Sequence, residues 1–544
     1  MSAEPRRVFG KTIRRSLNLF ESRKGDSSMC NSLESEIAVT DPMGHRVRFW
    51  VVTAVLAALF LGALDALVMS AAMPSIIAEL KGLELYGWVY SAYFLARAVC
   101  LPIFGKLSDL FDIRRLFLIA ITIFLTSSLL AGFAPDMETL IAGRIFQGIG
   151  AAGIFALVYI VLADIAPPGK RAKLLSLASS IWGIASVLGP TLGGFIVTYF
   201  SWRWIFFINV PISLFSMILI ARFLVEVREK KRSDSLDIAG AATLSVSILS
   251  LLMVVMVGGR NTTGLPIDTV FMMGITVVFV IAFYFIEKRA KDPILPLAFF
   301  KIRAFSIGNA CVFLSSFAIF SLFAYAPLYI QGAQGRTPME VGLAMIALSL
   351  GWSIGSFVLG QYLGGLTYKT ASVLGAVFLI SGSVLTLTFS QAATMMTCFW
   401  VFLLVGLGMG FVTLATLLTV QSSVDASDLG VATSSHQFSR TLGGSIGVGV
   451  SGGIVTARLS RAMEKLDLSD HFPNSTADLA TDFSRNVEHL FRQEVQAGLP
   501  LDLRITLQQA VGESVDGVFC SVLVVSILCL ICCLIIPPDD RSTK

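Results

Sequence analysis

Four ionisable residues lie deep inside long apolar stretches of the 544-residue sequence: Asp65, Arg97, Arg144 and Arg440. Charged side chains are costly inside a bilayer, so residues of this kind mark functional sites. Burial and a neighbouring arginine act in opposite directions on the proton affinity of a carboxyl group. Asp65 is therefore predicted to titrate near neutral pH, as coupling to protons requires. The alternative is a static Asp–Arg pair that only fixes helix packing.

Two helical faces gather polar groups around these charges. Arg144 opens the segment RIFQGIGAAG, in which Arg144 and Gln147 share one face of a helix. His436 and Arg440 share a face of a later apolar stretch. His436 is able to titrate near physiological pH, although a structural, hydrogen-bonded role is the alternative. Residues Arg97, Gln147, His436 and Arg440 are candidates for a substrate cavity or for proton coupling.

A glycine-rich segment, GIASVLGPTLGG, lies in the fifth apolar run. Small residues at four-residue spacing allow close approach of two helices, and a proline inside a helix removes a hydrogen bond and bends it. The segment is therefore predicted to form a sliding or rocking interface. Its key residues are Gly183, Gly189, Pro190, Gly193 and Gly194.

Composition indicates what positions these residues. The chain is 55% hydrophobic and 14% charged, whereas soluble domains are about 25% charged. The apolar residues fall into runs of about 18–25, long enough to cross a membrane as helices, and the alternating segments of a barrel are not seen. Two G-x-G-x-x-G matches lie inside apolar runs and do not follow a strand, so they do not indicate a dinucleotide site. We expect no enzyme activity, cofactor, metal or nucleic-acid partner.

The predicted fold is an all-α polytopic membrane protein with fourteen transmembrane helices. They are expected at about 49–71, 87–107, 115–134, 139–163, 173–198, 204–224, 237–258, 268–286, 304–330, 339–363, 371–389, 395–420, 433–457 and 516–536. Asp65 is the only carboxylate placed well inside these ranges. The first 48 residues contain no apolar core of a cleavable signal peptide.

Basic residues predict the orientation. The terminal segments and the loops on their side hold 28 Lys and Arg, whereas the short loops on the other face hold Lys81, Arg203, Arg260 and Arg336. Cytoplasmic loops are enriched in Lys and Arg, so both termini are expected in the cytoplasm and the protein in the cell (inner) membrane. A long external loop, 458–515, carries apolar residues at helical spacing. It is predicted to be an amphipathic helical hairpin, either a spacer or a gate.

Several motifs resemble those of the major facilitator superfamily, and of its fourteen-span drug:proton antiporters of the EmrB/QacA type in particular. GKLSDLFDIRR, residues 105–115, looks like the superfamily signature after the second span, although Asp112 and Ile113 replace the usual glycine and basic residue. RIFQGIGAAG is similar to the R-x-x-Q-G element, and the fifth run to the antiporter motif. SWRWIFFINVP and FSRTLGGSIGV resemble segments of the fourteen-span branch.

The resemblance implies a major facilitator fold of two six-helix bundles plus two inserted helices. The expected divisions are a cytoplasmic tail (1–48), an N-terminal bundle (49–225), an inserted pair (226–303), C-terminal spans 9–13 (304–457), the external loop (458–515), and the last span with a short tail (516–544). The cytoplasmic latch between bundles would involve Gly105, Asp109, Arg114 and Arg115. Arg144 would take part in proton coupling, and the glycines of the fifth run would favour antiport.

The implied function is proton-coupled export of hydrophobic or amphiphilic compounds, as in multidrug efflux, by alternating access. Its partners would be a small hydrophobic or amphiphilic substrate, protons and the lipid bilayer, with a periplasmic adaptor or lipoprotein as a further candidate. The alternative is export of an endogenous amphiphile such as a lipid, a lipid precursor or a siderophore. The antiporter motif disfavours a nutrient symporter, and buried charges have no use in a membrane scaffold.

Overall fold

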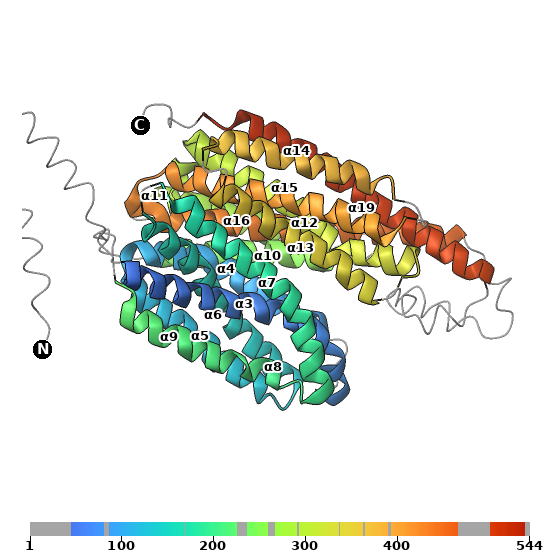
Figure 1. Cartoon of the computed structure of the whole chain (residues 1–544), viewed down its shortest axis with the longest axis horizontal. Coiled ribbons are helices and arrows are strands. Elements are labelled where there is room, and N and C mark those ends of the chain that lie inside the picture. The colour runs from blue at the N-terminus through green and yellow to red at the C-terminus, as the bar shows by residue number, and fades with distance from the viewer. Residues whose placement is uncertain are drawn as a thin grey trace, which may run out of the picture. The chain divides into compact units, whose positions relative to one another are not determined.

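Helices make up nearly all of the described chain in the computed structural model (Figure 1). The structure describes residues 45–80, 86–167, 169–225, 237–258, 267–290, 293–336, 338–362, 365–389, 393–465 and 501–538. Residues 1–48 and 49–544 form separate units. The predicted cytoplasmic tail lies almost wholly outside the described residues.

The first helix group combines seven helices. Helix α6 packs against α4, α5 and α7, α5 packs against α9, and Ser216 of α9 donates to the carbonyl of Ala54 in α3 at 2.8 Å. The group consists of α3 (His45–Leu80), α4 (Tyr86–Leu110), α5 (Ile113–Gly132), α6 (Met137–Asp164), α7 (Arg171–Tyr199), α8 (Trp204–Phe207) and α9 (Asn209–Phe223).

The second helix group is built around α15 and α12. Helix α15 packs against α13 and α14, and α12 packs against α16 and α19. The group consists of α12 (Arg303–Leu328), α13 (Pro338–Gln361), α14 (Tyr368–Thr386), α15 (Met395–Ser422), α16 (Leu429–Lys465) and α19 (Leu501–Ile535). Short helices accompany it: η2 (Leu297–Lys301), η3 (Tyr329–Ala333) and η4 (Ala426–Asp428).

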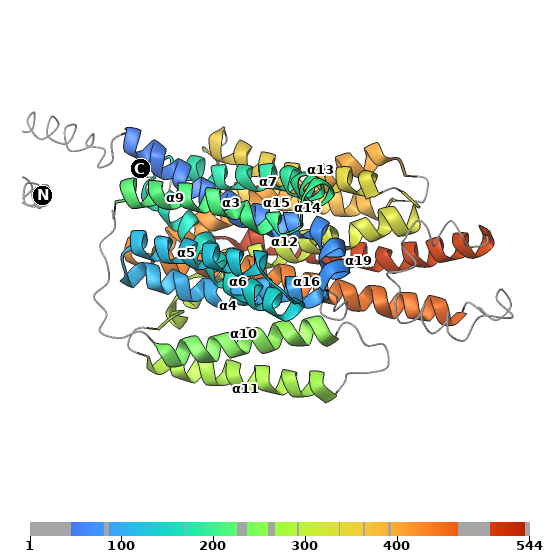
Figure 2. The ribbon, with the colours of Figure 1, turned by 90° about the horizontal axis from the view of Figure 1, so that it is seen from below.

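Two further helices, α10 (Ile238–Gly258) and α11 (Ile267–Arg289), pack side by side (Figure 2). Helix α10 contacts both α4 and α16, where Leu244 and Ile248 join a buried apolar cluster with Leu95. Only 11% of the apolar window of α11 is buried. The pair is therefore attached through α10, whereas α11 presents its side chains outward, as a lipid-facing helix would.

Capping residues fix several helix starts. The side chains of Asp112, Asp136, Thr367 and Thr394 accept the backbone N–H three residues later, at the starts of α5, α6, α14 and α15. A carboxylate there also interacts favourably with the helix dipole. The N–H of Thr139 lowers the pKa of Asp136 below its ordinary value of 3.8. Asp112, which departs from the family signature, thus acts as the N-cap of α5.

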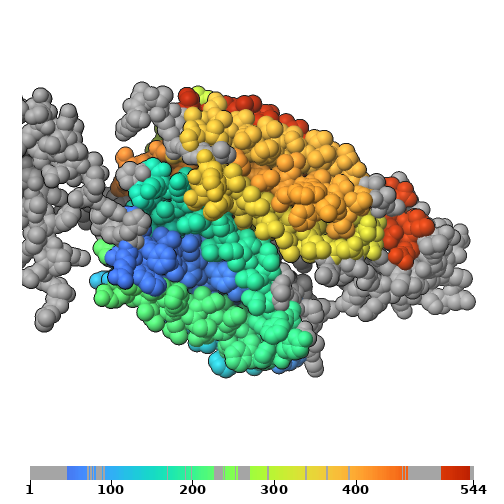
Figure 3. All heavy atoms as spheres, in the orientation of Figure 1, coloured from blue at the N-terminus to red at the C-terminus, as the bar shows by residue number. Residues whose placement is uncertain are grey.

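The two groups meet along a seam formed by α4 against α16 and by α7 against α13. Figure 3 shows the face on which α7 and α13 meet. Ser353 of α13 donates to the carbonyl of Ser179 at 2.7 Å, and Gln361 donates to the carbonyl of Lys173 at 2.9 Å. We call the end of the unit at which α4 ends and α16 begins the latch end, and the opposite end the distal end. Both of these hydrogen bonds lie toward the latch end.

The structure confirms an all-α fold, and each of the fourteen predicted spans overlaps a helix. By length and hydropathy, twelve helices in the described residues qualify as membrane spans, and a shorter apolar helix covers Ala239–Leu251 of α10. Helix α4, which carries Arg97, is not among these twelve. The criterion of length and hydropathy therefore gives twelve spans, whereas the number fourteen comes from matching each predicted span to a helix.

Helices occupy both ends of the predicted external loop, 458–515. Helix α16 continues to Lys465, and α19 begins at Leu501, so both ends of the segment 458–515 extend neighbouring spans. Residues 466–500, which carry most of the predicted hairpin, lie outside the described residues. The early start of α19 also places Asp516 inside a candidate span.

Candidate functional site

The carboxylate of Asp65 in α3 is held by two side chains of α6. Arg144 Nη1 lies 2.7 Å from Asp65 Oδ2, and Gln147 Nε2 donates to Asp65 Oδ1 at 2.7 Å. Arg144 Nη1 also donates to Gln147 Oε1 at 2.7 Å. The side chains of Asp65 and Arg144 are each 1% exposed. The structure thus brings three predicted site residues into one sealed network.

Two further side chains complete this network, and the sequence did not single them out. Asn209, the first residue of α9, donates to Asp65 Oδ1 at 3.1 Å and to Ser128 Oγ at 3.2 Å. Gln147 Nε2 also donates to Ser128 Oγ, at 2.8 Å. The available signal for Asn209 was an amide within the apolar segment SWRWIFFINVP, whereas Ser128 gave none. Both oxygens of Asp65 are consequently hydrogen-bonded.

Helix α4 connects this network to the seam. The guanidinium carbon of Arg144 lies 4.2 Å from the centre of the Tyr93 ring, and Arg144 Nε donates to the carbonyl of Val89 at 3.4 Å. One turn further along α4, the guanidinium carbon of Arg97 lies 4.9 Å from the ring centres of both Phe94 and Phe155. A displacement of Arg144 would therefore act directly on the helix that carries Arg97.

Arg97 faces Arg440 across the seam. Each is 8% exposed, and the two cations are close enough to repel each other. The guanidinium carbon of Arg440 lies 5.7 Å from the ring centre of Trp352. Among the described residues, Arg97 Nη1 has no hydrogen-bond partner. Two buried cations from different helix groups thus share one region without an anion beside them.

His436 lies on the same face of α16 but forms a contact within its own group. Its Nε2 is 3.0 Å from Thr416 Oγ1 of α15, and the residue is fully buried. Its Nδ1 has no hydrogen-bond partner in the part of the chain that the structure describes. The hydrogen bond to Thr416 is compatible with the structural role that the sequence left open. A role in proton coupling stays a prediction.

At the latch end, Asp109 of α4 caps a helix of the other group. Its two carboxylate oxygens accept the backbone N–H groups of Gly430 and Val431, each at 2.9 Å. These N–H groups are among the unsatisfied donors in the first turn of α16, where a negative charge is favoured. A Cβ on Gly105 would lie 1.8 Å from Ser434 Oγ and 2.9 Å from the carbonyl oxygen of Gly430. The close approach of α4 to α16 therefore requires glycine at position 105.

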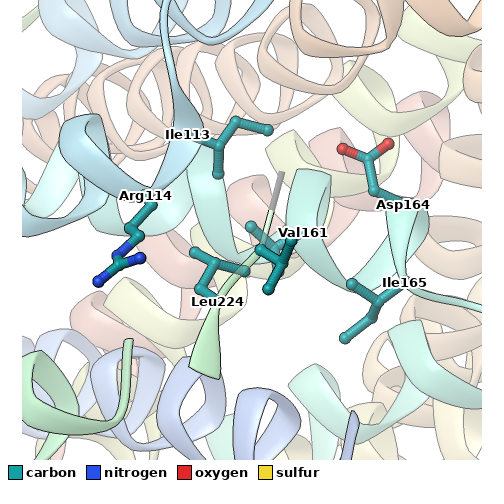
Figure 4. Close-up of a pocket in the computed structure, with 7 residues that line it drawn as sticks. Ile113, Arg114, Val161, Asp164, Ile165 and Leu224 are labelled. Carbon is teal, nitrogen blue, oxygen red and sulfur yellow. The ribbon is translucent and has the colours of Figure 1, made fainter. Parts of the chain in front are cut away.

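The two arginines of the predicted latch lie elsewhere. Arg114 donates to the carbonyl of Ala221 in α9, within the first group. Arg115 is exposed, and its backbone N–H is bound to the cap Asp112 at 3.0 Å. Arg114 also lines a small pocket, with Asp164 on its opposite side (Figure 4). Of the four predicted latch residues, the structure brings Gly105 and Asp109 to the seam.

The glycines of α7 serve two different contacts. A Cβ on Gly183 would lie 2.3 Å from Ser353 Oγ of α13, across the seam, whereas one on Gly189 would lie 2.8 Å from Leu67 Cβ of α3. Gly194 faces open space, and Gly193 is buried. The side chain of Pro190 lies outside the described residues. Only Gly183 is shown in contact with the opposite group.

A search with protein-family models matches residues 55–448 to the Major Facilitator Superfamily. The chain belongs to the major facilitator superfamily. This confirms the resemblance read from the motifs, at the level of the superfamily.

Curated relatives of this transporter include "Multidrug transporter protein MdtP" of Bacillus subtilis. The two are 33% identical over 411 residues, or 76% of each chain. "Multidrug resistance protein 3" of the same organism is 28% identical, covering 88% of this chain and 93% of its own length. "Efflux pump dotC" of Dothistroma septosporum is also 28% identical, covering 89% and 83%.

Solved structures confirm the major facilitator fold. The human organic anion transporter MFSD10 has a TM-score of 0.54 at 14% identity, covering 88% of this chain and 99% of its own. A bacterial homologue of the lysosomal transporter Spinster, in an inward-facing and unoccupied conformation, has a TM-score of 0.52 at 14% identity, covering 90% and 97%. At this identity the likeness is one of fold alone.

The transporter has a further buried carboxylate, Glu287, which the sequence prediction did not include. Glu287, near the end of α11, is 3% exposed and accepts the backbone N–H of Leu295 at 2.5 Å. Asp237 lies beside Glu287, and its Oδ1 accepts the backbone N–H of Gly240 at the start of α10. Lys106 of α4 is close enough to act on the charge of Glu287. Glu287 lies one residue beyond the predicted span 268–286, so the sequence prediction did not count it as a carboxylate inside a span.

At the distal end, Glu79 of α3 forms hydrogen bonds with the two residues that precede α8. Its carboxylate accepts hydrogen bonds from Arg203 Nη1 at 2.5 Å and from Trp202 Nε1 at 2.7 Å. These two donors lower the pKa of Glu79 below its ordinary value of 4.5. Half of the Glu79 side chain remains exposed. The pair lies beyond the candidate span of α3, which ends at Met69.

Proposed function

We propose that this transporter exports hydrophobic or amphiphilic compounds from the cytoplasm in exchange for protons, by alternating access between its two helix groups. The names of its relatives, a multidrug transporter protein, a multidrug resistance protein and an efflux pump that align over most of their lengths, support export of such compounds. The substrate is a small molecule that enters from the cytoplasm or the lipid bilayer. The basic latch end faces the cytoplasm, in line with the distribution of Lys and Arg.

The observation that carries proton coupling is the sealed ion pair of Asp65 and Arg144. Protonation of Asp65 would remove the only negative charge that this network supplies to Arg144. A buried charge left without its partner costs about 3–5 kcal/mol. Protonation therefore favours any conformation in which Arg144 gains other partners or water, and deprotonation restores the arrangement described here.

The contacts of Arg144 transmit this change to the seam. Arg144 touches α4 at Val89 and Tyr93, and the same helix carries Asp109 on the first turn of α16. A shift of α4 that follows the loss of the ion pair would strain or release that contact. Proton binding inside one helix group would in this way alter how the two groups meet.

The test is export by the purified transporter reconstituted into vesicles with an imposed pH gradient. Radiolabelled aromatic compounds of positive, neutral and negative charge serve as substrates. Asp65→Asn keeps the size and one hydrogen-bonding oxygen but does not titrate. We expect it to lose at least tenfold in gradient-driven export, whereas exchange of labelled for unlabelled substrate without a gradient persists. Asp65→Glu, which still titrates, should retain partial export.

The matched control is Ser128→Ala, because Ser128 belongs to the same network and has no charge to lose. It should retain gradient-driven export. Wild-type export by Asp65→Asn would refute the coupling role. Equal loss of export and exchange in that variant would show that Asp65 serves packing and not proton transfer.

A further inference from the structure

We infer that the seam between α4 and α16 binds the acid group of an anionic aromatic amphiphile, held jointly by Arg97 and Arg440. The inference rests on the proposed export function and names the class of its substrate. Its starting point is the arrangement of two buried cations, one from each helix group, that face each other with no carboxylate beside them in the described chain.

No aspartate or glutamate is among the groups that act on the charge of Arg97. These groups are Tyr93, Arg440 and Arg144, and the charge of Arg144 is already matched by Asp65 at 2.7 Å. Burial of unpaired cations is costly, and like charges add to that cost. An anion between the two guanidinium groups would remove both penalties. No other described feature of the seam supplies such an anion.

Unpartnered hydrogen-bond donors lie on α4, α7 and α16, the helices at this part of the seam. Arg97 Nη1 lacks a partner, as do Trp182 Nε1 and the side-chain amide of Gln437, one turn before Arg440. Trp182 stacks on Phe155 with ring centres 5.5 Å apart, and Arg97 lies over that same Phe155 ring. Guanidinium groups match carboxylate, sulfonate or phosphate oxygens in a planar, two-point geometry. The donors thus suit an acid group.

Aromatic rings define the rest of the ligand. Phe94 and Phe155 flank Arg97, and Trp352 flanks Arg440, with Phe320 beside it at 6.2 Å. Binding sites for small molecules combine mainly apolar walls with a few convergent polar groups, and ring pairs add to the burial energy. The seam is therefore suited to an aromatic body that carries one negative charge. A cationic aromatic compound would meet two like charges.

This arrangement also gives the substrate a mechanical role. Because Arg97 belongs to α4 and Arg440 to α16, an anion bound to both would bridge the two helix groups. In its absence the two guanidinium groups repel each other across the seam. Occupancy would consequently favour the state in which α4 and α16 are close, by the difference in affinity between the two states.

The experiment measures equilibrium binding of two matched probes to the full-length transporter in lipid nanodiscs. The probes are 1-pyrenebutyrate and a pyrene with the same linker that ends in trimethylammonium, both detected by energy transfer from tryptophan. We expect wild-type protein to bind the anion at least tenfold more tightly. Arg97→Gln and Arg440→Gln should each weaken anion binding about tenfold, which corresponds to one lost charged contact. Neither change should weaken binding of the cationic probe.

Arg97→Lys keeps the charge and should retain an intermediate preference for the anion. The matched control is Arg461→Gln, an exposed arginine further along α16, which should leave both affinities unchanged. A wild-type preference for the cationic probe, failure to bind either probe, or unchanged anion affinity in both glutamine variants would overturn the inference. Because binding needs no pH gradient, failure of proton-driven export would leave these results intact and would refute only the proposed function.

Discussion

Buried arginines have different partners in the Asp65 network and at the α4–α16 seam. Arg144 lies against a carboxylate, an amide and an aromatic ring, all supplied by the first helix group. Arg97 and Arg440 have aromatic rings on their flanks, and Arg440 acts on the charge of Arg97 from the other helix group. In the first site a carboxylate matches the arginine charge, whereas in the proposal above a bound ligand would supply that charge in the second. Burial of a cation alone therefore does not indicate whether it binds substrate.

The largest expected effect comes from breaking the ion pair of the first site. Arg144→Gln leaves the Asp65 carboxylate buried without its cation, and should cost about 3–5 kcal/mol of stability. The double variant Asp65→Asn/Arg144→Gln removes both charges and should recover at least half of that loss. Thermal unfolding of the purified protein, followed by tryptophan fluorescence, measures both. Strictly additive losses would mean that the two residues do not form a coupled pair.

The next effect concerns the contact that both sites share through α4. Asp109→Asn removes the negative charge from the first turn of α16, and should cost about 1–2 kcal/mol of stability. Transport should fall severalfold, because the same contact joins the two helix groups. Asp136→Asn is the matched control, since Asp136 caps α6 within one group. Equal loss of transport in both variants would contradict a role for Asp109 between the groups.

Removal of an arginine side chain at the seam should not destabilise the protein, in contrast to the two variants above. Arg440→Gln removes one of two like charges, and should leave the substrate-free protein as stable as wild type or more stable by up to about 1 kcal/mol. Its cation–π contact with Trp352 is a long one at 5.7 Å, so little is lost. Thermal unfolding without ligand is the measurement. A marked loss of stability would show that Arg440 has a structural partner. The charge of Arg440 would then be matched within the protein, as that of Arg144 is.

The smallest effect is expected at Glu79 and Arg203, an exposed counterpart of the Asp65–Arg144 pair. The pKa of Glu79 is lowered by its hydrogen bonds, so the contact stabilises the protein above pH 4.5. That contribution is lost as the pH falls below 4.5 through the pKa in the folded state. Wild-type protein should show a slight extra drop in melting temperature there, and Glu79→Gln should not. A large difference between the two at pH 7 would contradict the small contribution expected of an exposed pair.

Several parts of the site were predictable because they are local. Arg144 and Gln147 share a helix face by their three-residue spacing, and they do act on one carboxylate. Gly105 and Asp109 were predicted to join the bundles, and they lie at the seam. That the partner of Asp109 is a row of backbone N–H groups had no signal, because any helix start presents such donors. Arg114 lies in the same motif but donates to a backbone carbonyl of α9.

The helical class, the approximate positions of the helices and the superfamily could all be predicted from the sequence alone. Hydropathy and short motifs are properties of neighbouring residues, and a bilayer demands that every backbone group be satisfied within a helix. The tertiary structure decided which charges are matched. Asn209 reaches Asp65 across 144 positions of sequence, and Asp109 reaches Gly430 across 321. Whether a buried arginine has an anion beside it depends on how separate helices pack, and no local pattern records that.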